Sequence, residues 1–228
     1  MNMKKLIQQL ILSSGADKIG FGDVSEYVGD KYSDLTTAIS FVIRLSDSIM
    51  DEVKEGPTHE YFHMYRSVNR LIDDIALKTV IKLQREGYRA IPIAASQSIN
   101  LEGNKPYSGL FSHRMAATRA GIGWIGKNAS VVTPEYGPRI RLGTVLTDMK
   151  VEYDKPYNES YCGDCNICVQ KCPTYALLGT NWTTEINRED IVDVIACSNH
   201  MKDNYEMIGR GSVCGICISN CPIGKERL

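Results

Sequence analysis

Apolar residues in the first two thirds of the chain recur at spacings that predict alternating helices and strands. Between His59 and Gly87 they keep a period of 3.6 residues, which predicts the longest helix, with Thr58 as its cap and Gly87 as its stop. The β-branched run 38–45 predicts a buried strand. Other elements are expected as helices at 3–14 and 113–120, and as strands at 18–22, 89–94, 129–133 and 140–147.

Pro92 places the strand at 89–94 at a sheet edge or strand end, because proline cannot donate to a hydrogen-bond ladder. The segment 154–160 is the expected boundary between two domains, 1–155 and 156–228. Beyond it, short helices are expected near 174–178, 188–196 and 215–219.

Two segments between these elements are candidates for function. The polar loop 96–109 is long for a mere connection, and Ser96 and Gln97 stand where the sheet ends and a pocket is expected. In 121–128, three glycines within six residues either let the backbone approach a large ligand or let two chain segments cross.

Composition and charge narrow the class of protein. Apolar residues make up 43% and charged residues 23% of the chain, and the formal net charge of −1 implies no general basic face for nucleic acid. Lys4 and Lys5 precede an apolar stretch, but its residues recur at helical spacing, so an amphipathic helix is expected rather than a signal peptide. No segment approaches the ~20 apolar residues of a membrane span.

All eight cysteines fall in the C-terminal third, in a pattern typical of iron–sulfur proteins. The first run has the spacing of half a bacterial ferredoxin, the second repeats its end, and one cysteine stands between them. The runs are Cys162-x2-Cys165-x2-Cys168-x3-Cys172-Pro173 and Cys214-x2-Cys217-x3-Cys221-Pro222, with Cys197 upstream of the second.

In two-cluster ferredoxins the fourth cysteine of each run binds the other cluster. That rule assigns four cysteines to each of two [4Fe-4S] clusters. The sets are Cys162, Cys165, Cys168 and Cys221, and Cys172, Cys197, Cys214 and Cys217. Zinc sites would also use eight thiolates, but zinc does not call for an x2-x2 run followed twice by Cys-Pro. A disulfide framework requires an oxidising compartment, whereas clustered reduced thiols indicate the cytoplasm.

Three segments together resemble the epoxyqueuosine reductase family, whose members are tRNA-modifying relatives of the reductive dehalogenases. They are HRMAATRAGIGWIGKN at 113–128, LGTVLTD at 142–148 and the first cysteine run. The resemblance covers roughly 60–222. It implies an α+β fold, in which a nitroreductase-like sandwich domain is followed by a ferredoxin-like domain with two [4Fe-4S] clusters. It also implies a cobalamin-dependent reductase, in which the clusters deliver electrons to the cobalt of a corrinoid.

Carried onto this chain, the resemblance places 113–128 against the corrinoid. The expected cofactor-binding residues are Ser96, Gln97, His113, Arg114, Arg119, Gly121, Gly123, Gly126, Lys127 and Asn128. The alternative for Arg119 and Lys127 is a solvated side chain or a pair with Asp148 or Glu135.

Two departures from the family bear on the substrate. The family's C-terminal helical repeats, which help hold tRNA, have no counterpart here, so tRNA is a doubtful substrate. The family's catalytic aspartate aligns with Tyr61; dehalogenase relatives use a tyrosine, so Tyr61 is the expected proton donor. The alternative is a half-buried helix residue, and for His59 and His63 a pocket pair competes with two surface residues.

The expected function is therefore iron–sulfur reduction of a small molecule or a modified nucleoside through a corrinoid. A low-potential carrier such as ferredoxin or flavodoxin would supply the electrons. Two alternatives stay open: an electron-transfer protein that reduces a partner protein, and a reductase that binds FMN on the same scaffold.

Overall fold

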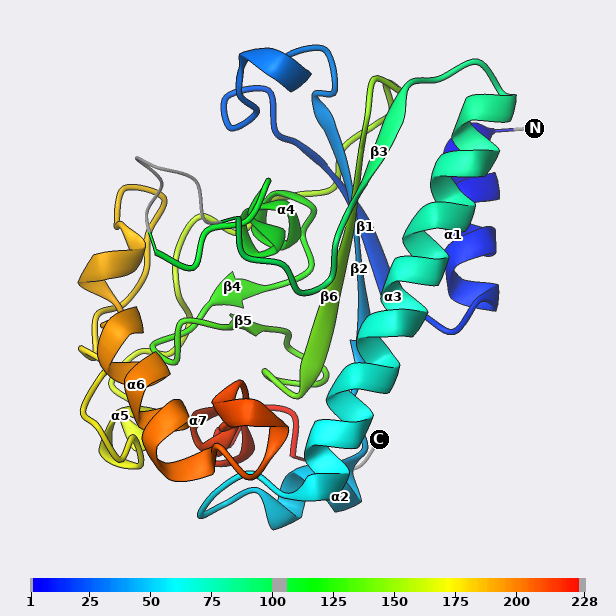
Figure 1. Cartoon of the computed structure of the whole chain (residues 1–228). Helices are drawn as coiled ribbons and strands as arrows, with labels where there is room; N and C mark the ends of the chain where they lie inside the picture. Colours follow the sequence, from blue (N-terminus) through cyan, green and yellow to red (C-terminus); the bar gives the residue numbers. More distant parts are fainter. Residues whose placement is uncertain (1, 100–105, 226–228) are drawn as a thin grey trace. The chain divides into compact units, whose positions relative to one another are not determined.

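A computed structural model describes residues 2–99 and 106–225. The part of the predicted loop 96–109 between residues 100 and 105 lies outside the described residues. In chain order the elements are α1 (Met3–Ser13), β1 (Lys18–Asp23), η1 (Asp30–Tyr32), β2 (Thr37–Arg44), α2 (Asp47–Glu52), α3 (His59–Arg85), β3 (Ala90–Ile93), α4 (His113–Arg119), β4 (Trp124–Ile125), β5 (Val131–Val132), β6 (Ile140–Thr147), α5 (Ile167–Gln170), η2 (Arg188–Asp190), α6 (Val194–Tyr205), η3 (Gly209–Gly211) and α7 (Ile216–Ser219) (Figure 1).

The chain forms two compact units that interleave along the sequence. Unit 1 consists of Met1–Arg44, Val68–Ile122 and Arg141–Tyr157. Unit 2 consists of Leu45–Ser67, Gly123–Ile140 and Asn158–Leu228. All eight cysteines belong to unit 2. The expected division into domains 1–155 and 156–228 stays a prediction.

Unit 1 is built on a four-stranded sheet in the order β1-β2-β6-β3. The outer pairs are antiparallel, with Phe21 opposite Ile39 and Ile91 opposite Leu146. Strand β3 carries Pro92 at the edge of the sheet, where its missing N–H costs no ladder bond.

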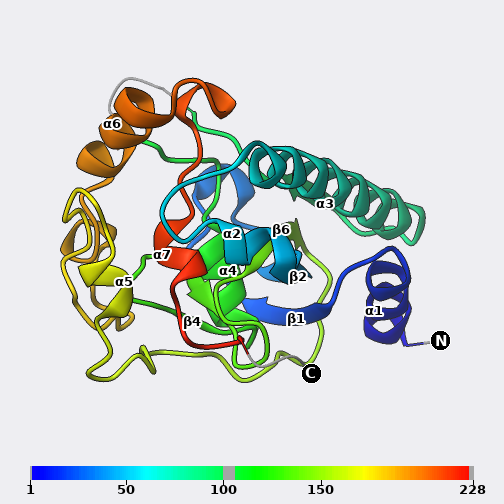
Figure 2. The ribbon, with the colours of Figure 1, turned by 90° about the horizontal axis from the view of Figure 1, so that it is seen from below.

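One face of this sheet is covered by α1 and the part of α3 that belongs to unit 1, which lie side by side (Figures 1 and 2). Alternate residues of β2 point to this face, because successive side chains of a strand point to opposite sides. They form one core with both helices, which includes Ile7, Ile11, Ile39, Phe41, Ile43, Ile72, Ile75 and Leu83.

Helix α4 covers the opposite face, where Ala116 packs against Ala38 and Leu146. The C-terminal end of α4 comes unusually close to β1. A Cβ added at Gly20 would lie 2.0 Å from the carbonyl oxygen of Ala120. Glycine at this position therefore lets the backbone of α4 pack directly on the strand.

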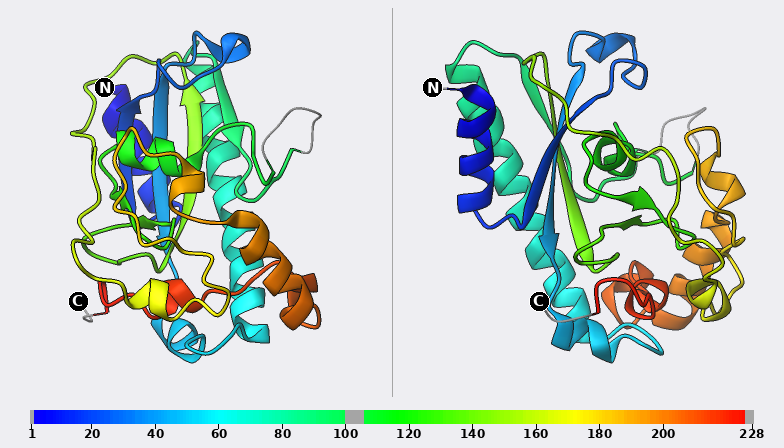
Figure 3. Two further views of the ribbon diagram at one scale, coloured as in Figure 1. Left: turned by 90° about the vertical axis from the view of Figure 1, so that its left-hand side faces the viewer. Right: turned by 180° about the vertical axis from the view of Figure 1, so that it is seen from behind.

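Unit 2 contains little regular structure. It has the two-stranded β4–β5 sheet, the helix α2, the first turns of α3 and the short elements around the cysteines. The four-residue helices α5 and α7, one in each cysteine run, lie side by side (Figure 3).

Most elements predicted from residue patterns in 1–147 are confirmed, and so is the α+β class. Thr58 caps α3 as expected, since its Oγ1 accepts a hydrogen bond from the Tyr61 amide at 3.1 Å. Within residues 2–99 and 106–225, no helix is both long and apolar enough to cross a bilayer.

Two predicted helices of the C-terminal third are wrong. In 174–178, Tyr175 has a φ of +54°, which ends helical geometry, and Leu177 bridges Val192 instead. In 188–196, the chain forms only η2 before α6 begins, because the Asp193 side chain caps α6 by accepting from the Ile195 and Ala196 amides. The strand expected at 129–133 shrinks to β5, since Ala129, with a φ of +56°, belongs to the preceding turn.

The close approach of α4 to β1 makes a stability prediction. Gly20→Ala should lower the free energy of unfolding by about 2 kcal/mol, because its Cβ would overlap a backbone oxygen that cannot move independently. Gly29→Ala is the matched control, since Gly29 has a φ of −74° and a Cβ there would meet nothing within 4 Å. Urea unfolding measures both variants, and equal midpoints would contradict the packing of α4 on β1.

Candidate functional site

The eight cysteines lie in the helices of unit 2 and in the connections next to them, and none forms a disulfide. Cys168 lies in α5, Cys197 in α6 and Cys217 in α7. The other five lie in the connections next to these helices. Loops, two single-turn helices and the longer helix α6 thus present the thiols from three separate parts of unit 2.

Four thiols of the first predicted set influence one another electrostatically. Burial, and then the charges of Cys221, Cys162 and Cys165, raise the pKa of Cys168 to about 12. Burial, followed by Cys162 and Cys165, raises the pKa of Cys221 to about 11. The fold therefore brings Cys221 to the first run, although more than forty residues separate it from Cys168 in the sequence.

The second predicted set behaves in the same way. Burial, and then the charges of Cys214 and Cys172, raise the pKa of Cys197 to about 11. Burial also raises the pKa of Cys217, which senses Cys214, Cys197, Cys168 and Cys172 in that order of influence. Cys197 thus lies with this set, as the ferredoxin rule predicts; the ligand roles themselves stay predictions.

This donor set fits iron–sulfur clusters. Thiolates are soft ligands, and each set has the four that a [4Fe-4S] cluster takes. Within the described part of the chain, no group of three or more His, Cys, Asp or Glu side chains could hold a single metal ion.

The β4–β5 turn lies beside the first cysteine loop. Lys127, only 4% exposed, donates from Nζ to Oδ1 of Asn166 at 3.0 Å. A Cβ added at Gly126 would lie 3.4 Å from the sulfur of Cys162. The candidate residues Gly126 and Lys127 therefore support the cysteine loop. Asn128 is also buried, and its Oδ1 accepts from the Ser130 amide within the same turn.

A buried arginine fastens the second cysteine run. Arg139, 2% exposed, donates to Asp51 at 3.0 Å and to the carbonyl oxygen of Ser219 at 3.1 Å, while Asp47 lies 3.6 Å away. The Ser219 hydroxyl donates to the carbonyl oxygen of Met50 at 2.6 Å. These bonds tie α2 to α7, which holds Cys217. Sequence reasoning missed Arg139 because arginine is mostly exposed in folded proteins.

The glycines of 121–128 each face protein atoms. An added Cβ would lie 2.7 Å from the carbonyl oxygen of Lys155 at Gly121 and 2.2 Å from that of Val132 at Gly123. Of the two explanations for these glycines, the crossing of chain segments accounts for both positions. A cofactor-binding role for them stays a prediction.

His113 is held at both ring nitrogens. Nε2 lies 2.9 Å from the carbonyl oxygen of Ala94, which can only accept, so Nε2 carries the proton. Nδ1 lies 2.8 Å from the Thr144 hydroxyl and accepts from it. Burial is the main cause of a lowered pKa, opposed by the bond to Ala94 and assisted by the charge of Arg141. His113 thereby anchors the start of α4 to β6.

The remaining unit 1 candidates do not gather around one point. Ser96 and Gln97 are exposed after β3, and Arg114 is half-buried in the first turn of α4. Arg119 donates from Nε to the carbonyl oxygen of Asp23 at 3.2 Å, and its guanidinium lies over the Tyr27 ring. The partners of Arg119 and Lys127 are thus Asp23, Tyr27 and Asn166, in place of Asp148 or Glu135.

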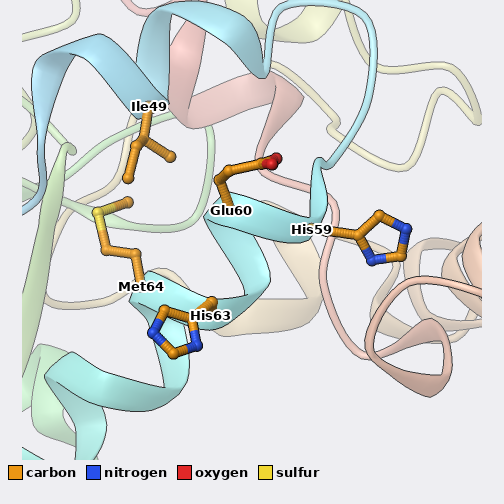
Figure 4. Close-up of a pocket in the computed structure, with 5 residues that line it drawn as sticks. All are labelled: Ile49, His59, Glu60, His63 and Met64. Atoms are coloured by element: carbon orange, nitrogen blue, oxygen red, sulfur yellow. The ribbon is translucent and has the colours of Figure 1, made fainter.

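Tyr61 and the two histidines of α3 lie in unit 2. Tyr61 is 4% exposed, and an added Cβ at Gly215 would lie 3.0 Å from its ring, so it packs beside the second cysteine run. A surface pocket of about 420 Å³ is lined by Ile49, His59, Glu60, His63 and Met64. The rings of His59 and His63 do not point toward one another there (Figure 4). The proton-donor role of Tyr61 stays a prediction.

Comparison with known proteins bears on this arrangement. Residues 161–224, which contain all eight cysteines, match the family described as 4Fe-4S double cluster binding domain. The epoxyqueuosine reductase of Staphylococcus aureus (strain NCTC 8325 / PS 47) is 37% identical over 118 residues, or 50% of this chain. That of Bacillus subtilis (strain 168) is 34% identical over 123 residues, or 53% of this chain. The chain is a relative of epoxyqueuosine reductase.

These matches cover less than half of the relatives, 30% of the S. aureus protein and 31% of the B. subtilis protein. Among solved structures, epoxyqueuosine reductase from Streptococcus thermophilus has a TM-score of 0.62 and 20% identity to this chain. The alignment covers 100% of this chain and 67% of the S. thermophilus chain. A catabolic reductive dehalogenase aligns with 96% of this chain and 31% of its own, at a TM-score of 0.73 and 19% identity. The fold is therefore that of both groups: an α+β sheet domain and a cysteine-rich double cluster domain.

The grouping of the thiols makes a prediction about Cys197. Cys197→Ser should damage the same cluster as Cys214→Ser, because both thiols lie in the second set. Cys162→Ser is the matched control and should damage the other cluster. EPR spectra of the reduced proteins, with iron analysis, distinguish the two losses. Intact signals from both clusters in Cys197→Ser would remove Cys197 from the ligands.

The environment of His113 makes a prediction about pH. Its folded pKa lies below the usual 6.5, so the unfolded chain binds a proton more readily than the folded one as the pH falls below 6.5. The free energy of unfolding should therefore fall between pH 7.5 and pH 5.5. His113→Gln can still donate to Ala94 but cannot titrate, so its stability should fall less. Urea unfolding at both pH values measures the difference, and parallel losses would contradict a neutral His113.

Proposed function

We propose that this chain is an iron–sulfur reductase of the epoxyqueuosine reductase type, with two [4Fe-4S] clusters that pass electrons to a bound corrinoid. The observation that carries the proposal is the pair of four-thiol sets inside the segment that matches the double cluster domain. A bare electron carrier would have no need of unit 1, which has its own sheet and core.

The corrinoid part of the proposal rests on the relatives. A solved reductive dehalogenase, with a TM-score of 0.72 to this chain and 19% identity, is described as suggesting a mechanism for B12-dependent dehalogenation. When bound, cobalamin supplies low-valent cobalt for the reduction. A Cβ added at Gly121, Gly123 or Gly126 would meet protein atoms, so these glycines do not themselves form a cradle for the corrinoid.

The scaffold type of each unit, the cellular location, the electron donor and the substrate class are part of the same proposal. A sheet covered by helices on both faces supports a nitroreductase-like scaffold for unit 1, and the cysteine spacing supports a ferredoxin-like cluster region. Eight free thiols support a cytoplasmic location. We propose a low-potential ferredoxin or flavodoxin as electron donor and a small molecule or modified nucleoside as substrate.

A second candidate function is favoured by the same glycines. Gly121, Gly123 and Gly126 each lie against other protein atoms and not against open space. In this second function the chain holds the clusters without a corrinoid and carries electrons to a partner protein. A reductase with FMN in unit 1 would be its flavin counterpart.

Metal analysis separates these functions. The chain is expressed with cobalamin supplied and purified anaerobically, and its iron, cobalt and absorption spectrum are measured. The proposal predicts about eight irons and one tightly held cobalt per chain. Eight irons without cobalt, after loading with excess cobalamin, would contradict the corrinoid reductase. The yellow absorption of bound flavin would then indicate the FMN enzyme, and its absence the electron carrier.

A further inference from the structure

His200 has a buried ring nitrogen that finds no acceptor within the described part of the chain. The Asn204 side-chain nitrogen donates both to the carbonyl oxygen of His200 and to His200 Nδ1, each at 3.1 Å. A carbonyl oxygen can only accept, so this atom is the amide nitrogen, and Nδ1 must accept from it. In the neutral ring the proton then lies on Nε2. The atom without a partner is therefore a hydrogen-bond donor.

This donor lies on the helix that carries Cys197, a thiol of the second set. His200 follows Cys197 in α6 by three residues, which places both on the same side of the helix. The His200 ring packs edge-on against Tyr205, with 5.3 Å between ring centroids. Tyr205 in turn senses the charge of Cys214. His200 thus shares a side of α6 with Cys197, and its ring contacts Tyr205, which is close enough to Cys214 to sense its charge.

A buried donor without an acceptor is rare in folded proteins, because it loses its hydrogen bond to water and gains nothing in return. Thiolate and sulfide sulfurs of an iron–sulfur cluster are acceptors. We propose that His200 donates from Nε2 to a sulfur of the cluster held by Cys172, Cys197, Cys214 and Cys217, and that this bond raises the reduction potential of that cluster. The inference rests on the two-cluster part of the proposed function and not on the corrinoid.

The direction of the effect follows from charge. A cluster gains one negative charge on reduction, and a hydrogen bond to a more negative acceptor is stronger. The bond therefore stabilises the reduced form more than the oxidised form. Hydrogen bonds to the sulfurs are among the factors that set cluster potentials.

Two substitutions separate the hydrogen bond from packing. His200→Phe keeps a ring against Tyr205 but removes the donor, whereas His200→Gln keeps an N–H close to the position of Nε2. At a fixed ambient potential, the ratio of reduced to oxidised second cluster should fall about tenfold in His200→Phe, which corresponds to 59 mV for one electron. His200→Gln should restore most of the loss. Asn199→Ala, an exposed neighbour in α6, is the matched control and should change nothing.

The measurement is an anaerobic redox titration followed by EPR, with the two signals assigned through Cys197→Ser and Cys162→Ser. Equal potentials in wild type and His200→Phe, with both clusters intact, would overturn the inference alone. Equal shifts in His200→Phe and His200→Gln would do the same, because they would indicate packing. Wild-type protein without the second cluster would overturn both the inference and the proposed function.

A second readout needs no variant. In reduced wild-type protein labelled with ¹⁵N-histidine, pulsed EPR should detect a histidine nitrogen and an exchangeable proton coupled to the second cluster. No coupling to either nucleus would overturn the inference even if His200→Phe failed to fold.

Discussion

Unit 2 depends on the burial of several of its cysteine thiols, although Cys165 is exposed. Removed from water, the thiols of Cys168, Cys197 and Cys221 have pKa values of about 11 to 12 and keep their protons at neutral pH. Only the positive charge of bound iron makes such buried thiols good thiolate ligands. Because unit 2 contains few long elements of its own, the proposed clusters would also hold its fold together by binding thiols from distant segments.

Two earlier segments of the chain, 45–67 and 123–140, belong to unit 2 and support the cysteine region. Arg139 and Ser219 bind α2 to the second cysteine run, and Lys127 binds the β4–β5 turn to the first. The two hydrogen bonds of Ser219 are buried, so they are shielded from competing water, and the bond of Lys127 to Asn166 is partly buried. The part of the chain before Asn158 therefore supplies three supports to the cluster region: α2, the first turns of α3, and the β4–β5 turn.

Sequence reasoning succeeded where one local pattern fixes the structure. The 3.6-residue period of α3, the β-branched run of β2 and the cysteine spacing each predicted their element or grouping. It failed where tertiary contacts decide. The helix expected at 174–178 does not form because Tyr175 has a positive φ, and only the structure could decide between the two explanations of Gly121 and Gly123. Sequence reasoning missed His200 because the helix predicted near 188–196 ends before this residue, whereas α6 extends to Tyr205.

The central claim is that two cubane clusters occupy the two interleaved thiol sets of one chain. Native mass spectrometry of the anaerobically purified protein tests it most directly, because each [4Fe-4S] cluster adds a defined mass and charge. The account predicts a single species that carries two [4Fe-4S] clusters. A species with one cluster, or with two zinc ions in place of the clusters, would contradict it.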